Sequence, residues 1–155
     1  MRTSCRFAMA VHVLAVLGYK AGRRATSARL AGSVNTNPVV IRRLLRVLQE
    51  ARLVETCKGA GAGSCLSRSP GSINLAQVFR AVEADEPFVM PPGKPNPACP
   101  VGQCIQAAIA QVFASARKAL ERDLAKTTLA DVLRSVEHRP SSLRQENYET
   151  RIQAN

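Results

Sequence analysis

Three arginines in one short stretch are the strongest chemical feature of the sequence: Arg42, Arg43 and Arg46. A glycine-rich run that carries one lysine follows them, Lys58-Gly-Ala-Gly-Ala-Gly-Ser64. A guanidinium group presents its N–H donors in a planar fork, which suits bidentate binding of phosphates and of guanine base edges. These residue types favour recognition of an anion. Which anion is bound depends on the helices and strands that carry the residues.

Cysteine thiols are the second candidate chemistry, and the chain has five: Cys5, Cys57, Cys65, Cys99 and Cys104. An odd number argues against a disulfide framework. Because Cys99 precedes Pro100, we expect it at the start of a helix, where the helix dipole favours the reactive thiolate. Cys104 lies five residues on, about 140° around that helix, which disfavours a bond to Cys99. Cys99 and Cys104 are thus candidate redox sensors, and inert thiols are the alternative.

The arginines lie on a predicted amphipathic helix. Asn37 is a suitable N-cap and Pro38 suits the first helical position. One face repeats apolar residues at helical spacing, Ile41, Leu44, Leu45 and Leu48, and is expected to be buried. The arginines fall off this stripe, together with Val39 and Val40. The helix is therefore apolar on one side and cationic on the other.

Two earlier helical segments and a later hairpin complete the predicted domain. Residues 4–19 show helical spacing of apolar side chains, and a short helix over residues 26–31 precedes a turn at residues 33–36. Three helices with a tight turn between the last two are typical of a helix-turn-helix. Short strands around the glycine-rich run predict a β wing, whereas a phosphate-binding loop lacks its GxxxxGK[ST] pattern.

The second half of the sequence predicts a helix through which two subunits associate. Six prolines lie within residues 86–100, which indicates a linker, and a long helix follows over about residues 101–126. At about 1.5 Å per residue this helix is close to 40 Å long, so its apolar stripe calls for a partner subunit. We therefore expect a dimer interface at Ile105, Ile109, Val112, Ala116 and Leu120. The predicted boundaries are 1–84 for the winged helix-turn-helix, 85–100 for the linker and sensor loop, 101–136 for the dimerisation helices and 137–155 for a polar tail.

The distribution of charge along the chain indicates the kind of partner that it binds. The chain carries a net charge of +11, and residues 1–70 hold 12 Lys and Arg against 2 Asp and Glu. Such asymmetry favours an anionic partner for the first half, either nucleic acid or an acidic membrane surface. No apolar run is long enough for a membrane span, and no signal-peptide cleavage pattern is present, which favours a cytoplasmic protein without a membrane partner. No catalytic constellation occurs, so an enzyme is not expected.

Several stretches together resemble the Rrf2 family of bacterial winged-helix transcription regulators, which includes IscR, NsrR and CymR. They are SCRFAMAVHVLAVL, TSARLAGSVNTNPVVIRRLLRVLQEARLVE, KGAGAG and NLAQVFRAVE, while NPACPVGQCIQ is most similar to the YwnA-like branch. The resemblance covers roughly residues 1–136. It implies a mainly α fold: a winged helix-turn-helix with a two-stranded β wing, followed by a long C-terminal dimerisation helix.

The resemblance also implies a function: a homodimeric, sequence-specific regulator, by expectation a repressor, that binds a palindromic operator in double-stranded DNA. The third helix would enter the major groove and the wing the minor groove. The expected DNA-binding residues are Thr26, Ser27, Ser33, Asn37, Val39, Val40, Arg42, Arg43, Arg46, Lys58, Gly59 and Gly61.

Three alternatives remain open at the level of sequence. One is an iron–sulfur-sensing regulator of the same family. Only Cys99 and Cys104 lie near the start of the long helix, so Cys5 or His12, from the first helix of either subunit, would have to complete the ligand set. We therefore expect no cofactor. The others are a basic RNA-binding protein and a protein-interaction module.

Overall fold

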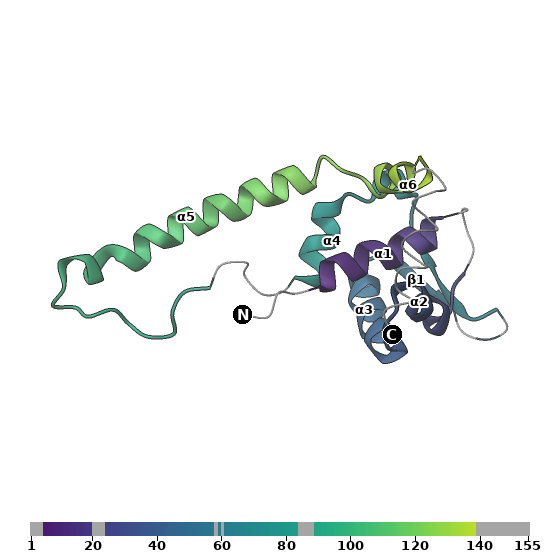
Figure 1. Ribbon diagram of the computed structural model, residues 1–155, viewed down its shortest axis with the longest axis horizontal. Helices are drawn as coiled ribbons and strands as arrows, with labels where there is room; N and C mark the ends of the chain where they lie inside the picture. Colours follow the sequence, from purple (N-terminus) through teal and green to yellow (C-terminus); the bar gives the residue numbers. More distant parts are fainter. Residues whose placement is uncertain (1–4, 20–23, 58, 60, 84–88, 139–155) are drawn as a thin grey trace, which may run out of the picture.

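The computed structural model describes residues 5–19, 24–57, 59, 61–83 and 89–138. Figure 1 shows a helical body from which one long helix, α5 (Pro100–Leu124), projects. The body contains α1 (Arg6–Gly18), α2 (Ser27–Val34), α3 (Pro38–Glu50), α4 (Leu75–Val82) and α6 (Leu129–Glu137). A two-stranded sheet and the 3-10 turn η1 (Pro70–Ser72) complete it.

Helices α2 and α3 form the predicted helix-turn-helix. Thr26 caps α2, because its side chain accepts a hydrogen bond of 3.3 Å from the N–H of Arg29. Asn35 ends α2 in the left-handed conformation, with a φ of 58°, which turns the chain sharply. The Asn37 side chain then accepts from the N–H of Val39 at 2.8 Å, which confirms Asn37 as the N-cap of α3.

The wing is an antiparallel hairpin of β1 (Val54–Cys57) and β2 (Gly63–Leu66). A short segment before α2 extends it: the N–H and C=O groups of Ala25 and Ser64 exchange two hydrogen bonds of 2.9 Å. The register pairs Cys57 with Gly63 and Cys65 with Glu55, so the two cysteines of the hairpin are not opposite one another.

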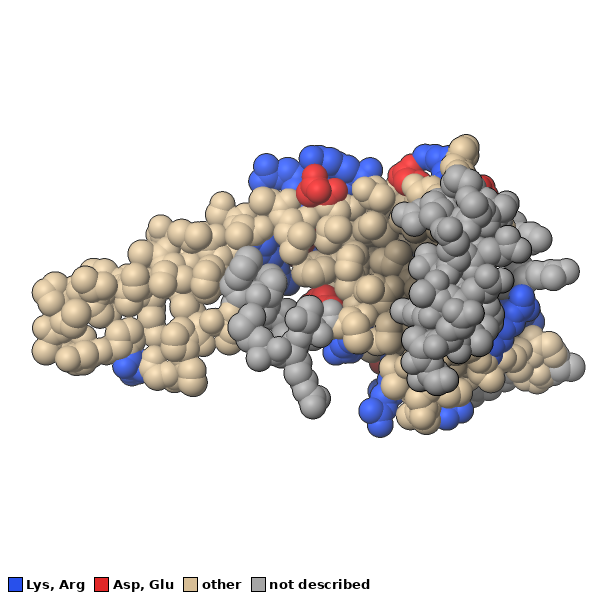
Figure 2. All heavy atoms as spheres, in the orientation of Figure 1, with Lys and Arg blue, Asp and Glu red and all other residues tan. Residues whose placement is uncertain are grey.

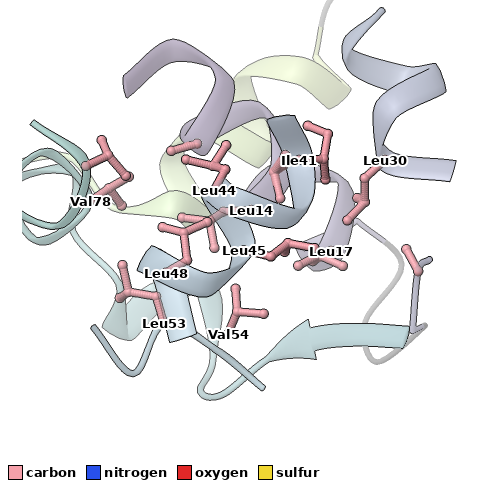
Figure 3. Packing of buried hydrophobic residues seen from close by; sticks show 14 of the residues in the cluster. Leu14, Leu17, Leu30, Ile41, Leu44, Leu45, Leu48, Leu53, Val54 and Val78 are labelled. Carbon is pink, nitrogen blue, oxygen red and sulfur yellow. The ribbon is translucent and has the colours of Figure 1, made fainter. Parts of the chain in front are cut away.

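The core forms where these helices meet, and it confirms the predicted buried stripe of α3. Figure 3 shows its packing. The labelled core residues are Leu14, Leu17, Leu30, Ile41, Leu44, Leu45, Leu48, Leu53, Val54 and Val78. Because α3 buries this face, Arg42, Arg43 and Arg46 are left exposed on the opposite side.

Residues at the end of α4 stabilise the N-terminus of helix α1. Cys5 stands at the N-cap but makes no side-chain cap hydrogen bond. Instead, the backbone N–H of Phe7 donates to Oε1 of Glu83 at 3.2 Å. The Phe7 ring also packs edge-to-face on Phe79, with centroids 5.6 Å apart. A carboxylate near the helix N-terminus is favourable, so α1 and α4 are joined by both charge and packing.

Helix α6 returns to the body, although the sequence grouped it with α5 as a dimerisation element. Leu129 is fully buried in the core, and its N–H donates to the carbonyl of Ile73 at 2.8 Å. A capping box between Thr128 and Asp131 starts the helix. Leu133 packs against the same core, so α6 covers the body.

Helix α5 makes few contacts within the chain and has no buried residue. Residues 89–99 run out to its far end in Figure 1, and α5 then leads back to the body. Near the body, Glu121 lies 3.2 Å from Arg117 and 3.9 Å from Arg80 of α4. No helix in the described part of the chain is long and apolar enough to cross a membrane.

Candidate nucleic-acid interface

The exposed face of α3 carries three basic side chains, Arg42, Arg43 and Arg46. In Figure 2, basic side chains gather along the lower edge of the body, around the position of α3 in Figure 1. Val39 and Val40 at the start of the helix are also exposed, at 42% and 37%. A helix that is exposed, cationic and partly apolar on one face has the composition needed to contact base edges and thymine methyl groups.

Arg46 is held in place by an ion pair within the helix. Its Nε lies 3.1 Å from Oε1 of Glu50, and the two side chains are 82% and 62% exposed. An exposed pair at this spacing contributes only about 0.3–0.5 kcal/mol. A good bidentate contact to a base contributes about 1–3 kcal/mol, so DNA can displace Glu50 from Arg46.

A groove runs between the start of α2, the exposed face of α3 and the wing. It has a volume of about 380 Å³, and Thr26, Ser27, Arg42 and Arg46 are among the residues that line it. On the wing side, the groove is lined by Thr56, Gly63 and Ser64. The structure therefore brings the first residues of α2 together with the arginines, beside the backbone amides of a helix N-terminus that favour phosphate.

Gln49 lines the same groove and was missed by the sequence reasoning. The signal was present: Gln49 follows Arg42 by seven residues and Arg46 by three, which places all three on one face of a helix. A glutamine amide can bind adenine through two hydrogen bonds. Gln49 therefore joins the arginines as a candidate base-reading residue.

Ser33 and Asn37 have other partners in the structure. Ser33 belongs to α2 rather than to the predicted turn, and its Oγ lies 3.1 Å from Nε2 of His12 on α1. It does not line the groove of Thr26 and Ser27. Asn37 uses its side-chain oxygen to cap α3, which leaves its amide N–H₂ group as the part that can contact DNA.

The wing loop uses glycine where the backbone requires it. Gly59 and Gly61 have φ values of 88° and 79°, a region that side-chain-bearing residues rarely adopt. Nη1 of Arg24 donates to the carbonyl of Gly61 at 3.4 Å, which ties the wing to the segment before α2. Lys58, the predicted wing contact, lies outside the described residues.

Cys99 stands at the N-cap of α5, as predicted, and its side chain is exposed without a cap hydrogen bond. Cys104 is exposed inside the same helix. The segment before Cys99 is folded back onto α5: Nε2 of Gln103 donates to Pro97 O at 2.9 Å, and Nε2 of Gln106 donates to Gly93 O at 3.2 Å. Cys5, at the N-cap of α1, occupies the same kind of position.

The described residues of a single chain do not form a set of ligands for a metal cluster. Within the described ranges, no three His, Cys, Asp or Glu side chains gather where a metal ion could bind. Cys99 and Cys104 lie at the far end of α5, whereas His12 bonds to Ser33 in the body. An iron–sulfur cluster needs about four protein ligands, and the described residues of one chain do not bring even three candidates together.

Known proteins share both the sequence and the fold. Residues 3–135 match the Rrf2 profile, which is described as an iron-dependent transcriptional regulator. The chain is 38% identical over 128 residues to YwnA of Bacillus subtilis strain 168, a candidate HTH-type transcriptional regulator, with 83% of this chain and 94% of YwnA covered.

Two solved structures share the fold. One, of a candidate DNA-binding protein, is 37% identical with a TM-score of 0.67, covering 83% of this chain and 98% of that one. CymR of B. subtilis, the global cysteine regulator, is 20% identical with a TM-score of 0.63, covering 87% and 98%.

Proposed function

The chain belongs to the Rrf2 family of DNA-binding transcriptional regulators, and from this premise we propose that it is a cytoplasmic, homodimeric repressor that binds a palindromic operator. The observation that carries the proposal is the groove in which Arg42, Arg46 and Gln49 meet the start of α2 and the wing. The family consists of regulators, not of enzymes.

DNA reading is divided between the elements of this head. The exposed side chains of α3 contact base edges in the major groove, because only there does each base pair present a distinct pattern. Thr26 and Ser27 bind phosphates with the amides at the start of α2, which sets the register of the head. The wing, with Gly59, Gly61 and Lys58, reaches the minor groove.

Dimerisation is supported by the outer half of α5. Residues 101–116 include no charged side chain, and on the face seen in Figure 2 this part of α5 is free of acidic and basic groups. Val101 and Val112 are 65% and 64% exposed, and Ile105 is 36% exposed. This uncharged segment is about 24 Å long, and because it projects from the body it needs a cover, which a second α5 provides.

Redox or electrophile sensing at Cys99 is supported by its place in the fold. The thiol is exposed where the segment 93–99 turns into α5. Oxidation or alkylation there adds bulk or charge at the end of the dimer helix. Because this end of α5 lies far from the body, the added group acts through the pairing of the two α5 helices, and a change in that pairing alters the spacing of the two heads.

Selection of bound duplexes from a random DNA library, followed by footprinting, tests the function. We expect an inverted repeat whose half-sites are about one helical turn apart, or a multiple of it. Structured RNA of equal length serves as the competitor. Equal affinity for RNA and for every duplex would contradict a sequence-specific regulator.

A further inference from the structure

A second hollow lies on the body between α1, α2 and α6, apart from the DNA-facing groove. Its volume is about 520 Å³, within the usual range of small-molecule pockets. The side chains that matter here are His12, Arg24, Arg29, Ser33, Leu133 and Val136. Its walls therefore combine an apolar side, supplied by α6, with a polar side supplied mainly by α2 and the segment before it.

The charged side chains that line this cavity are all positive. Its lining residues include two arginines and no aspartate or glutamate. Among the residues that the structure describes, no carboxylate forms an ion pair with Arg24 or Arg29. Arginines beside an apolar wall are suited to a ligand with a planar anionic group at one end and an apolar body at the other.

The polar residues of the cavity also connect it to the DNA-binding elements. Arg24 donates to the wing carbonyl of Gly61 at 3.4 Å, a long hydrogen bond to a neutral acceptor. The contact between His12 and Ser33, at 3.1 Å, joins α1 to α2. A carboxylate offers a guanidinium two parallel hydrogen bonds and a full negative charge, neither of which the single Gly61 carbonyl supplies. An anion in the cavity therefore competes with the wing for Arg24.

We propose that this cavity binds a small organic anion with an apolar body, such as an aryl or alkyl carboxylate, and that its occupation weakens operator binding by releasing the wing. The second half of this statement rests on the proposed DNA-binding function. The first half does not, because the cavity is formed by α1, α2 and α6 and can be tested without DNA.

Calorimetric titration of the full chain with 2-naphthoate tests the site, and neutral 2-naphthamide is the matched ligand. We expect saturable 2-naphthoate binding that is at least tenfold tighter than binding of the amide. The double variant Arg24→Gln/Arg29→Gln should lose at least tenfold in affinity. Arg68→Gln/Arg122→Gln removes the same charge from two exposed positions outside the cavity and should bind like the parent. Equal affinity of the two double variants, or no saturable binding, overturns the site.

The coupling is tested with Val136→Asp, which places a carboxylate at the exposed edge of the cavity, where the side chain is 51% exposed. This variant should bind the operator like the parent yet respond at least tenfold less to 2-naphthoate. Naphthoate that binds the parent without changing its operator affinity overturns the coupling. A parent that binds naphthoate but no DNA contradicts the proposed function instead, so the two failures are distinguishable.

Discussion

A β-carbon added to Gly102 would come nearer than 3.0 Å to the carbonyl oxygen of Asn96, a separation that real β-carbons essentially never show. The same carbonyl accepts the N–H of Cys99 at 3.1 Å, and the Asn96 side chain accepts from Ala98 N at 2.9 Å. The first turn of α5 is therefore packed directly under the backbone that leads into Cys99. This contact explains why a glycine stands inside a helix, where it normally weakens the structure.

Gly102→Ala should open this turn. The substitution gains about 0.5–1 kcal/mol of helix preference, but an overpacked contact with backbone costs about 1–3 kcal/mol, so disruption wins. Amide hydrogen exchange should become faster at Cys99 in particular, because its N–H loses Asn96 as acceptor. Gly93→Ala is the control, since a β-carbon there meets no atom within 4 Å. Unchanged exchange at Cys99 would show that the turn adapts without loss.

Arg42→Ala and Arg43→Ala should each weaken operator binding by about 1–3 kcal/mol if the side chains contact bases, and relax sequence preference at the contacted position. Gln49→Ala should act in the same way at an adenine, given its place beside Arg42 in the groove. Arg122→Ala, an exposed arginine on α5, is the charge-matched control. Operator titrations at two salt concentrations separate base from phosphate contacts. Wild-type affinity in all three variants would remove α3 from the interface.

The sequence predicted helix α3 and its exposed arginines correctly because the signals are local. Asn37, Pro38 and the stripe from Ile41 to Leu48 mark one helix, and the buried stripe leaves the arginines outside. The sequence could not show whether the apolar face of an amphipathic helix packs against its own chain or against another subunit. Leu129 lies in the core of its own chain, and its N–H donates to the carbonyl of Ile73, a residue far from it in the sequence.

Long-range contacts were missed for the same reason. The pairing of Ala25 with Ser64 and the bond from Phe7 to Glu83 join residues that are far apart in the chain. Neither pair has a recurring pattern that a single sequence can show. The cavity between α1, α2 and α6 depends on three such packings, so it could only appear in the structure.

Ile105→Asp/Val112→Asp should abolish dimers. Both side chains are exposed in the single chain, at 36% and 64%, so the fold of the monomer should survive the added charge. In a dimer the same carboxylates would be buried in an apolar interface, which is strongly unfavourable. Sedimentation should show monomers, and operator affinity should fall because each monomer reads one half-site. Gln111→Asp, about 120° around α5 from this face, should stay dimeric. A folded double variant that still sediments as a dimer would exclude this face.

Asp131→Ala should lower stability at neutral pH more than at low pH. The hydroxyl and backbone N–H of Thr128, followed by Arg134, hold the pKa of Asp131 below its usual value of 3.8. A lowered pKa means that the ionised carboxylate stabilises the folded state above about pH 4 and that this contribution is lost as the pH falls through the folded value. Urea midpoints of parent and variant should differ at pH 7 and approach each other at pH 3. Asp123→Ala, which removes an exposed pair with Lys126, is the control. A gap that stays equal at both pH values would assign the effect to helix propensity alone.

Cys99→Ser should bind the operator like the parent but fail to release it after oxidation or alkylation. The reason is the position of the thiol, which is exposed at the start of α5, beside the segment that leads into the helix. Cys104, also exposed but inside the helix, should react with iodoacetamide more slowly. Cys104→Ser should therefore behave like the parent unless a disulfide between subunits forms. Mass spectrometry of the treated protein identifies the modified thiols, and Cys5→Ser controls for the second exposed cap cysteine. If Cys99→Ser releases DNA as readily as the parent, the response does not pass through Cys99.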